Sequence, residues 1–293
     1  MTGDSSVRVR FYQPPAALRP YFTTFYITEI DVADGGRVTD HLHPEWANVR
    51  FVDGSLPESE IDGSPPMRGV AAIATGPTST TTRFTIGPAR IWGVGLLPLG
   101  WARFVGAPAN ELADRLFDIG REPAFAAFRP LAETLFGDVP DEAAELARIV
   151  AHFEAGTCHA LHDEARIMAC HNAMIDPEIG SVAEMAEAAG LASHTVERIC
   201  RRYFGFPPRM LLRRQRFMRS LVQYMLDPSL HWISAMDSHY HDQAQFVRDF
   251  HRFMGMSPSE YAALPHPVLS GVMIARQRSA GAAVQALHPP GVA

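Results

Sequence analysis

The chain has 293 residues, of which 47% are hydrophobic and 20% are charged, and its formal net charge is −6. This composition excludes a disordered or fibrous protein and gives room for two domains and a substantial core. Runs of about eighteen apolar residues are missing, and the start, MTGDSSVRVR, lacks the apolar segment of a signal peptide. We therefore expect a cytoplasmic protein with no membrane partner.

The charges divide unevenly along the chain. Residues 1–180 hold 14 Arg and 24 acidic residues, whereas residues 181–293 hold 12 Arg and 8 acidic residues. All 26 basic residues are Arg, so their clustering is more informative than the identity of any one of them. This division indicates an acidic domain that senses a partner, followed by a basic domain that binds nucleic acid.

The first hundred residues have the pattern of a β-rich domain. Short runs of aromatic and β-branched residues predict strands at 21–30, 48–52, 69–75, 80–86 and 90–97. Gly87 and Pro88 separate the last two runs and predict a hairpin. Residues 53–66, with three prolines and four acids, predict a loop.

His41 and His43 form a metal-like pair, and alternate residues of a strand share one face. Glu45 follows them too closely for a cupin metal motif, and no second motif supplies another histidine. We therefore expect a solvated or core-edge histidine pair with no metal and no cofactor, and metal binding by the two histidines is the alternative. With Trp46 and Trp92, these histidines are candidates for a ligand pocket, although lone aromatic residues are more often core.

After Leu99 the pattern becomes helical, with helices predicted at 99–106, 111–117, 123–136 and 141–155. The last helix has an apolar face that we expect to form any homodimer contact. Gly156 marks the predicted end of a first domain, residues 1–156, with sensing and dimerisation roles. The three cysteines, Cys158, Cys170 and Cys200, lack the spacing of metal ligands and are expected to be reduced thiols.

A helix-turn-helix is predicted after a first helix at 163–175. The sequence SVAEMAEAAGLASHTVERICRRYF starts at Ser181, which forms a capping box with Glu184. Gly190 ends this helix where the backbone needs positive φ, and Ser193 is expected to cap the next one. A small residue before the turn lets the two helices cross closely, as in units that present a recognition helix to the DNA major groove.

Pro207 and Pro208 start a longer helix to about Leu226. A second unit follows, with a helix near 231–238, a helix at 242–254 capped by Asp242, and a capping box of Ser257 with Glu260. The tail, residues 267–293, is expected to be partly disordered apart from a short helix at 268–279.

These two units resemble the DNA-binding domain of AraC-type transcriptional regulators. The strongest part of the resemblance is YHDQAQFVRDFHRFMGMSPSEYAAL, with its D-Q, an aromatic residue, Arg, F and G-M-S-P-x-x-Y. More weakly, LRPYFTTFY and GVGLLPLGWARFVGAPANELADRLFDI resemble the cupin-like sensor domain of one branch of that family. The resemblance implies an α+β protein: a cupin-like β-rich domain with a helical appendage, then an all-α DNA-binding domain at 157–266 with two helix-turn-helix units.

The resemblance implies that base contacts come from His194, Glu197 and Arg198 in the first unit and from Gln243, Ala244 and Arg248 in the second. The remaining DNA-binding candidates are Arg201, Arg213, Arg214 and Arg252. The arginine run on the joining helix, which also includes Arg216 and Arg219, is expected to contact phosphates. One departure is visible: Asp237-Ser238-His239 stands where the family has a turn glycine.

We expect a transcription regulator, such as an activator, with no enzymatic activity. Double-stranded DNA is the main partner, and RNA polymerase, an unknown small-molecule effector and a second copy of the chain are further candidates. Two alternatives remain: a cupin-type metal enzyme or metal sensor with an accessory helical domain, and a helical module that binds a protein and no DNA.

Overall fold

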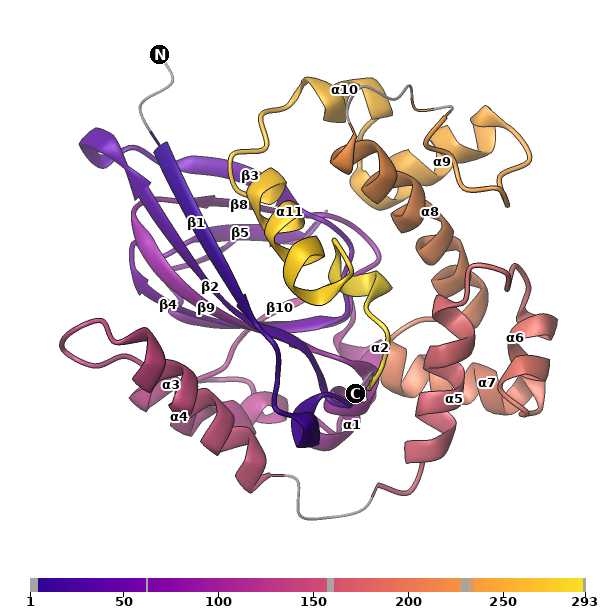
Figure 1. Cartoon of the computed structure of the whole chain (residues 1–293), viewed down its shortest axis with the longest axis horizontal. Helices are drawn as coiled ribbons and strands as arrows, with labels where there is room; N and C mark the ends of the chain where they lie inside the picture. The colour runs from indigo at the N-terminus through magenta and orange to yellow at the C-terminus, as the bar shows by residue number, and fades with distance from the viewer. Residues whose placement is uncertain (1–4, 62, 157–160, 228–231, 233, 292–293) are drawn as a thin grey trace.

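The computed structural model describes residues 5–61, 63–156, 161–227, 232 and 234–291. In these residues, two antiparallel sheets come first and a set of helices follows (Figure 1), which confirms the predicted α+β class. One sheet has the strand order β1 (Ser5–Tyr12), β2 (Phe22–Val32), β9 (Ala89–Leu96), β4 (Ala47–Gly54), β7 (Ala72–Thr75) and β10 (Leu116–Asp118). The other has the order β3 (Val38–Leu42), β8 (Thr82–Ile86), β5 (Glu58–Ile61) and β6 (Met67–Arg68).

Strand β2 has buried side chains on both faces of its sheet. Successive side chains of a strand point to opposite faces. Phe25 and Ile27 are fully buried in the core that the helical appendage covers. Tyr26 and Thr28 face the other way and line a cavity in the β-sheet domain. Because both faces are covered, β2 is a nearly continuous run of aromatic and β-branched residues.

Three local predictions in this domain are wrong, wholly or in part. Gly87-Pro88 does not form a hairpin, because β8 pairs with β3 and β5 while β9 pairs with β2 and β4, so the turn carries the chain from one sheet to the other. The helix predicted at 111–117 ends early: α2 spans Ala109–Leu112, and β10 then adds to the free edge of β7. Part of the predicted loop at 53–66 forms β5, which pairs with β8.

The helical appendage consists of α1 (Pro98–Phe104), α2, α3 (Arg129–Thr134) and α4 (Glu142–Ala155), together with the 3₁₀ turn Pro123–Phe128. In α4, Ile149 and Phe153 are fully buried, and the Phe153 ring lies 4.4 Å from that of Phe22. The apolar face that we expected to form a dimer contact is therefore used inside the chain.

The C-terminal helices are α5 (Glu164–Ile175), α6 (Val182–Ala188), α7 (Ser193–Ile199), α8 (Pro208–Leu226), α9 (Gln243–Met254) and α10 (Pro258–Ala263), with a π-helical turn at Cys200–Phe204. Cys158 lies outside the described residues, as does much of the helix predicted near 231–238. Of that segment, residues 234–238 form turns rather than a helix. No helix in the described part of the chain is long and apolar enough to cross a membrane.

The tail is part of the fold, and the short helix predicted at 268–279 forms there. Helix α11 (Leu269–Ala280) packs against β1, and the 3₁₀ turn Gln285–Leu287 follows it (Figure 1). Residues 282–286 are buried. The apolar core is also continuous across the predicted boundary at 156, because side chains of α5 to α7 belong to the same cluster as those of the sheets. The second unit shares a separate cluster with the tail.

Candidate nucleic-acid interface

The first helix-turn-helix forms as its sequence predicts. The Ser181 Oγ accepts the N–H of Glu184 at 3.2 Å, and the Glu184 carboxylate accepts the N–H of Ser181 at 3.0 Å. Gly190 has a φ of +64°, a left-handed conformation that glycine adopts without steric cost. Ser193 does not cap α7, because it is the first helical residue and Ala192 holds the capping position.

Helix α7 buries Val196 and Ile199, and its opposite side faces solvent. Helix α9 repeats this arrangement fifty residues later, with Phe246 and Asp249 at the equivalent buried positions. The repeat follows from the periodicity of a helix that is covered on one side only. Both units therefore present a helix whose outer face is open, which is the requirement for a helix that enters a DNA groove.

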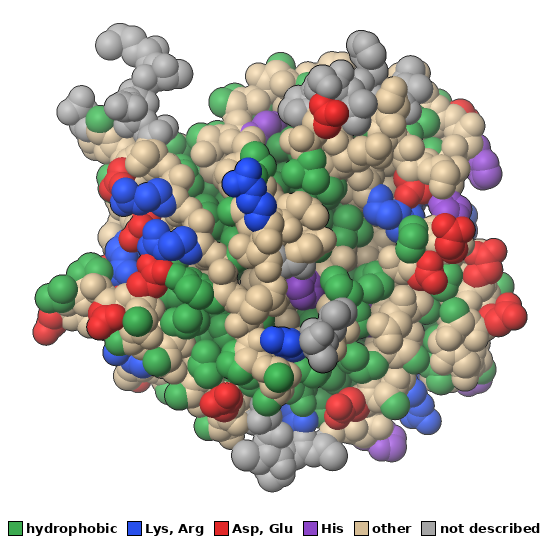
Figure 2. Space-filling model, in the orientation of Figure 1, with side chains coloured by type: hydrophobic (Ala, Val, Ile, Leu, Met, Phe, Trp, Pro, Cys, Tyr) green, Lys and Arg blue, Asp and Glu red, His purple; other side chains and the backbone are tan. Residues whose placement is uncertain are grey.

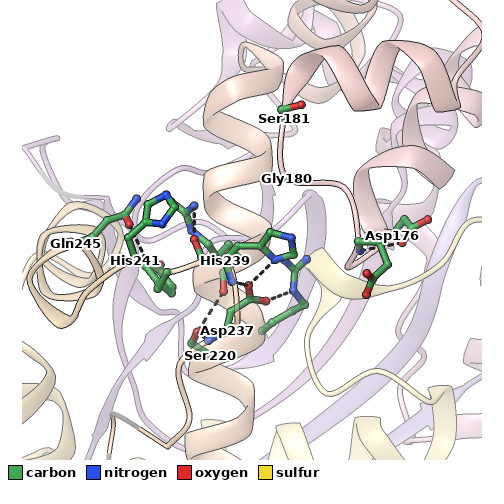
Figure 3. Close-up of polar contacts among 12 residues, drawn as sticks. Asp176, Gly180, Ser181, Ser220, Asp237, His239, His241 and Gln245 are labelled. Carbon is green, nitrogen blue, oxygen red and sulfur yellow. Dashed lines mark hydrogen bonds and ion pairs between the residues drawn. The ribbon is translucent and has the colours of Figure 1, made fainter.

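The start of α9 is fixed by a different turn from that of the first unit. Asp242 caps the helix by accepting the N–H of Gln245 at 2.6 Å. Upstream, Asp237 accepts bonds from the N–H of His239 at 3.0 Å and from Arg219 at 2.5 Å (Figure 3). Among the described non-glycine residues only Asp114 has positive φ, so His239 does not take the place of the expected turn glycine by adopting a left-handed conformation.

Most of the predicted DNA-binding residues are exposed in the structure. They are His194, Arg198, Arg201, Gln243, Ala244, Arg248 and Arg252, whereas Glu197 and Arg213 are half-buried and Arg214 is buried. Figure 2 shows one face of the molecule, on which acidic side chains lie over the first unit near α6. Helix α6 carries the exposed acidic residues Glu184 and Glu187, so its surface is a poor one for phosphate.

Several of these arginines already have a carboxylate partner. Arg198 lies 3.2 Å from Asp163, which also bonds Arg166 and the Tyr203 hydroxyl. Burial opposes ionisation of Asp163, but the hydrogen bonds from Arg198, Arg166 and Tyr203 lower its pKa to about 2. Arg201 pairs with Glu197 at 2.7 Å. Among the described residues, Arg248 and Arg252 have no ion-pair partner, so their charges are free.

The arginines of the joining helix hold the second unit in place. Arg213 and Arg216 both pair with Asp249, a fully buried carboxylate on α9 that also accepts a bond from the Tyr240 hydroxyl. Arg219 pairs with Asp237 in the turn before α9. These contacts connect α8 to the second unit, so the charge run is mainly a set of internal ion pairs rather than a solvated face.

Arg214 is not a surface residue, and its predicted phosphate contact is wrong for this arrangement of the chain. The side chain is fully buried, and its Nη1 donates to the carbonyl oxygens of Glu45 and Thr78. The guanidinium lies 4.2 Å from the centre of the Trp46 ring. Burial lowers the pKa of Arg214 to about 9. The residue therefore fixes α8 against the β-sheet domain.

Of the four predicted ligand-pocket residues, only His43 lines the cavity. Trp46 packs between Arg214, His171 and Phe204. Trp92 is a core residue whose Nε1 donates to Glu145 at 2.7 Å, and His41 lies beside the cavity rather than in its wall. In the part of the chain that the structure describes, no group of three or more His, Cys, Asp or Glu side chains is placed to hold a metal ion.

The histidine motif contacts the C-terminal part of the chain. His43 Nε2 lies 2.7 Å from the Tyr261 hydroxyl of α10. Asp40 accepts the N–H groups of Val268 and Leu269 at the start of α11, and its Oδ1 lies 3.3 Å from His266 Nδ1. Burial raises the pKa of Asp40, but these hydrogen bonds hold it below its usual value. Asp40 and Tyr261 were not predicted; the alternation of Val38, Asp40 and Leu42, which puts an acidic residue on the apolar side of a strand, is the one signal that could have indicated Asp40.

Two helices with open outer faces, one before and one after the long helix α8, form the arrangement of a DNA-binding domain with two helix-turn-helix units. Residues 185–263 match the family model described as a helix-turn-helix domain. This domain is of the AraC type, which confirms the resemblance seen in the sequence. A search of curated protein sequences finds no match to the chain.

Solved structures give a more distant comparison. ToxT from Vibrio cholerae has 11% identity to this chain and a TM-score of 0.41, with 88% of this chain and 97% of that chain covered. ToxT from Vibrio cholerae O395 has 11% identity and a TM-score of 0.39, with 88% and 96% covered. The AraC-like transcriptional activator CuxR has 10% identity and a TM-score of 0.28, with 73% and 86% covered.

Proposed function

We propose that this protein is a sequence-specific transcription regulator that reads DNA with α7 and α9. The proposal rests on one observation: the order of buried and exposed residues in α7 recurs fifty residues later in α9. In each unit the buried residues share one side of the helix, and an arginine stands at the same outer position, Arg198 in one and Arg248 in the other. Arginine at such a position can bond both acceptors of a guanine in the major groove.

The joining helix supports simultaneous contact by the two units. Helix α8 has 19 residues. At ~1.5 Å per residue it spans roughly 28 Å, which is close to one turn of B-DNA, about 34 Å. We propose that His194, Arg201, Gln243, Ala244 and Arg252 contribute further contacts to bases or phosphates.

We further propose that the β-sheet domain senses a small molecule. Its cavity lies next to the contacts that connect the two parts of the chain, namely His43 with Tyr261 and Asp40 with the start of α11. A molecule that binds this cavity can therefore favour or disfavour one arrangement of the DNA-binding units.

The proposal is tested with the purified full-length protein and fragmented genomic DNA. We expect enrichment of sites that carry two short conserved elements about 10 base pairs apart, and affinity that falls steeply with salt. Enrichment of no sequence, with weak binding that is independent of salt, would favour a module that binds protein. Arg248→Ala is the variant of choice for this experiment, because Arg248 has no internal partner among the described residues.

A further inference from the structure

The C-terminal tail forms part of the wall of the cavity. Leu269, Met273 and Arg276 from α11 line it, and Gln285 from the 3₁₀ turn closes the same side. Gln285 is anchored there, because its Nε2 donates to the carbonyl oxygen of Ala47 at 2.8 Å. The tail lies outside the matched helix-turn-helix domain, and it connects the cavity directly to the end of the second unit.

Most of the cavity wall is apolar. The apolar side chains in the wall include Ile30, Val52, Ile73, Ile86, Ile91 and Met273. The cavity volume is about 140 Å³. A cavity of about 150 Å³ lined by such residues accommodates a benzene molecule, so the space suits an apolar body of that size.

The charges in the wall do not balance. The wall contains Glu45, Arg50 and Arg276 as its charged residues among those described. Arg50 and Glu45 form an ion pair at 2.6 Å. Arg276 has no carboxylate within ion-pair distance in the described part of the chain, so the wall carries one more positive charge than negative charges.

Arg276 also has unused hydrogen-bonding capacity. The residue is 5% exposed, and its Nη1 donates to the Thr24 Oγ1 at 3.2 Å. Its Nε and Nη2 have no hydrogen-bond partner in the structure. A buried charge without a partner is costly, and an unsatisfied guanidinium fork matches the two oxygens of a carboxylate.

Burial lowers the pKa of Arg276 to about 10, so the guanidinium remains protonated at neutral pH. A single positive charge favours a monoanion over a dianion such as phosphate. The apolar wall, in turn, disfavours sugars and other ligands that carry many hydroxyl groups, because each buried hydroxyl needs a partner.

We propose that the cavity binds a small monocarboxylate, with its carboxylate on Arg276 and an apolar body of about the size of a benzene ring between the sheets. This inference rests on the proposed sensing function and names its ligand class. The bound carboxylate neutralises Arg276 and ties α11 to the β-sheet domain. Because α11 follows α10 directly, binding shifts the DNA-binding units toward the arrangement in which the tail is docked.

The test uses the full-length protein and three probes, benzoate, phenylacetate and hexanoate, each compared with its uncharged amide by calorimetry. We expect at least one carboxylate to bind about tenfold or more tightly than its amide, a preference expected of a charge-assisted bond. Arg276→Met should remove this preference. Arg278→Met is the matched control, because Arg278 lies on the same helix and is exposed, and it should leave binding unchanged.

A second variant covers the case in which Arg276→Met fails to fold. Val272→Phe retains Arg276 and fills the cavity, and it should abolish binding of the probes. Failure of all three carboxylates to bind the wild-type protein, or equal binding by the wild-type protein and either cavity variant, would overturn the inference. Binding of duplex DNA, measured without probes, separates this inference from the proposed function. Salt-dependent DNA binding with no carboxylate binding overturns this inference alone. Carboxylate binding with no DNA binding supports the ligand site and overturns the proposed function.

Discussion

The imidazole Nε2 of His43 lies 2.7 Å from the hydroxyl oxygen of Tyr261, and this buried contact joins the β-sheet domain to the last helix of the second helix-turn-helix unit. Removal of either partner leaves the other polar group buried and unsatisfied. We therefore expect His43→Phe and Tyr261→Phe each to lower the free energy of unfolding by about 1–3 kcal/mol. Urea unfolding measures both.

The double variant tests whether the contact itself is responsible. His43→Phe with Tyr261→Phe should lose less than the sum of the single losses, with a coupling free energy of about 1 kcal/mol. Strict additivity of the two single effects would show that the hydrogen bond contributes nothing to the docking of the two parts.

Acid should destabilise the protein through its buried histidines. Burial lowers the pKa of His43 and His171 to about 3 and that of His288 to about 4. In the unfolded chain an imidazole titrates near pH 6.5. The unfolded state therefore binds more protons between these values, and the stability present above pH 6.5 is lost as the pH falls. By pH 5 each histidine should cost about 2 kcal/mol.

The variant His171→Phe tests how much the protonation of one of these histidines contributes to the loss of stability in acid. The ring of His171 packs edge-on against Trp46 and Phe204, a site that suits phenylalanine. Urea unfolding at pH 7 and pH 5 should show a smaller loss of stability for this variant than for the wild-type protein. The exposed His194→Phe should keep the wild-type pH dependence, and equal curves for all three proteins would contradict the prediction.

Arg214 and Arg209 lie on the same helix but should affect DNA binding differently. Arg209 is exposed at the start of α8, whereas Arg214 is buried against the β-sheet domain. Arg209→Ala should reduce the slope of log affinity against log salt by about 0.9, as expected for one lost phosphate contact. Arg214→Ala should leave that slope unchanged and lower the melting temperature. A reduced slope for Arg214→Ala would mean that the buried arrangement opens when DNA binds.

Arg248→Ala should weaken binding to the preferred site by about 1–3 kcal/mol and relax the preference at one or two base pairs. Its melting temperature should not change, because Arg248 has no internal ion pair among the described residues. Arg198→Ala should lose specificity and also stability, since its partner Asp163 is nearly buried. Uniform loss of affinity across all sequences would assign both arginines to the DNA backbone.

His239→Gly should destabilise the second unit by about 1 kcal/mol. The variant loses the contact of Nδ1 with Asp237 at 3.1 Å and gains backbone freedom in the unfolded chain. No positive φ at this position offsets the loss. A higher melting temperature for His239→Gly would show that glycine suits the turn better than the structure indicates.

The sequence by itself determined the elements whose stability is local. The capping boxes at Ser181 and Ser257, the left-handed Gly190 and the start of α8 at Pro208 all form as predicted, because each depends on neighbours within a few residues. The same reason explains why the two recognition helices and their exposed faces could be located from periodicity alone.

Only the tertiary structure decided which charges are free and where the tail lies. Arg214 and Arg248 have the same side chain in the same basic domain, yet one is enclosed by the β-sheet domain and the other faces solvent. The His41-to-Glu45 segment looked like a metal motif, but His43 bonds Tyr261, which lies more than two hundred residues further along the chain. Helix α11 similarly covers a cavity formed by strands from the other end of the sequence. Such contacts depend on the packing of distant segments, and no local pattern encodes them.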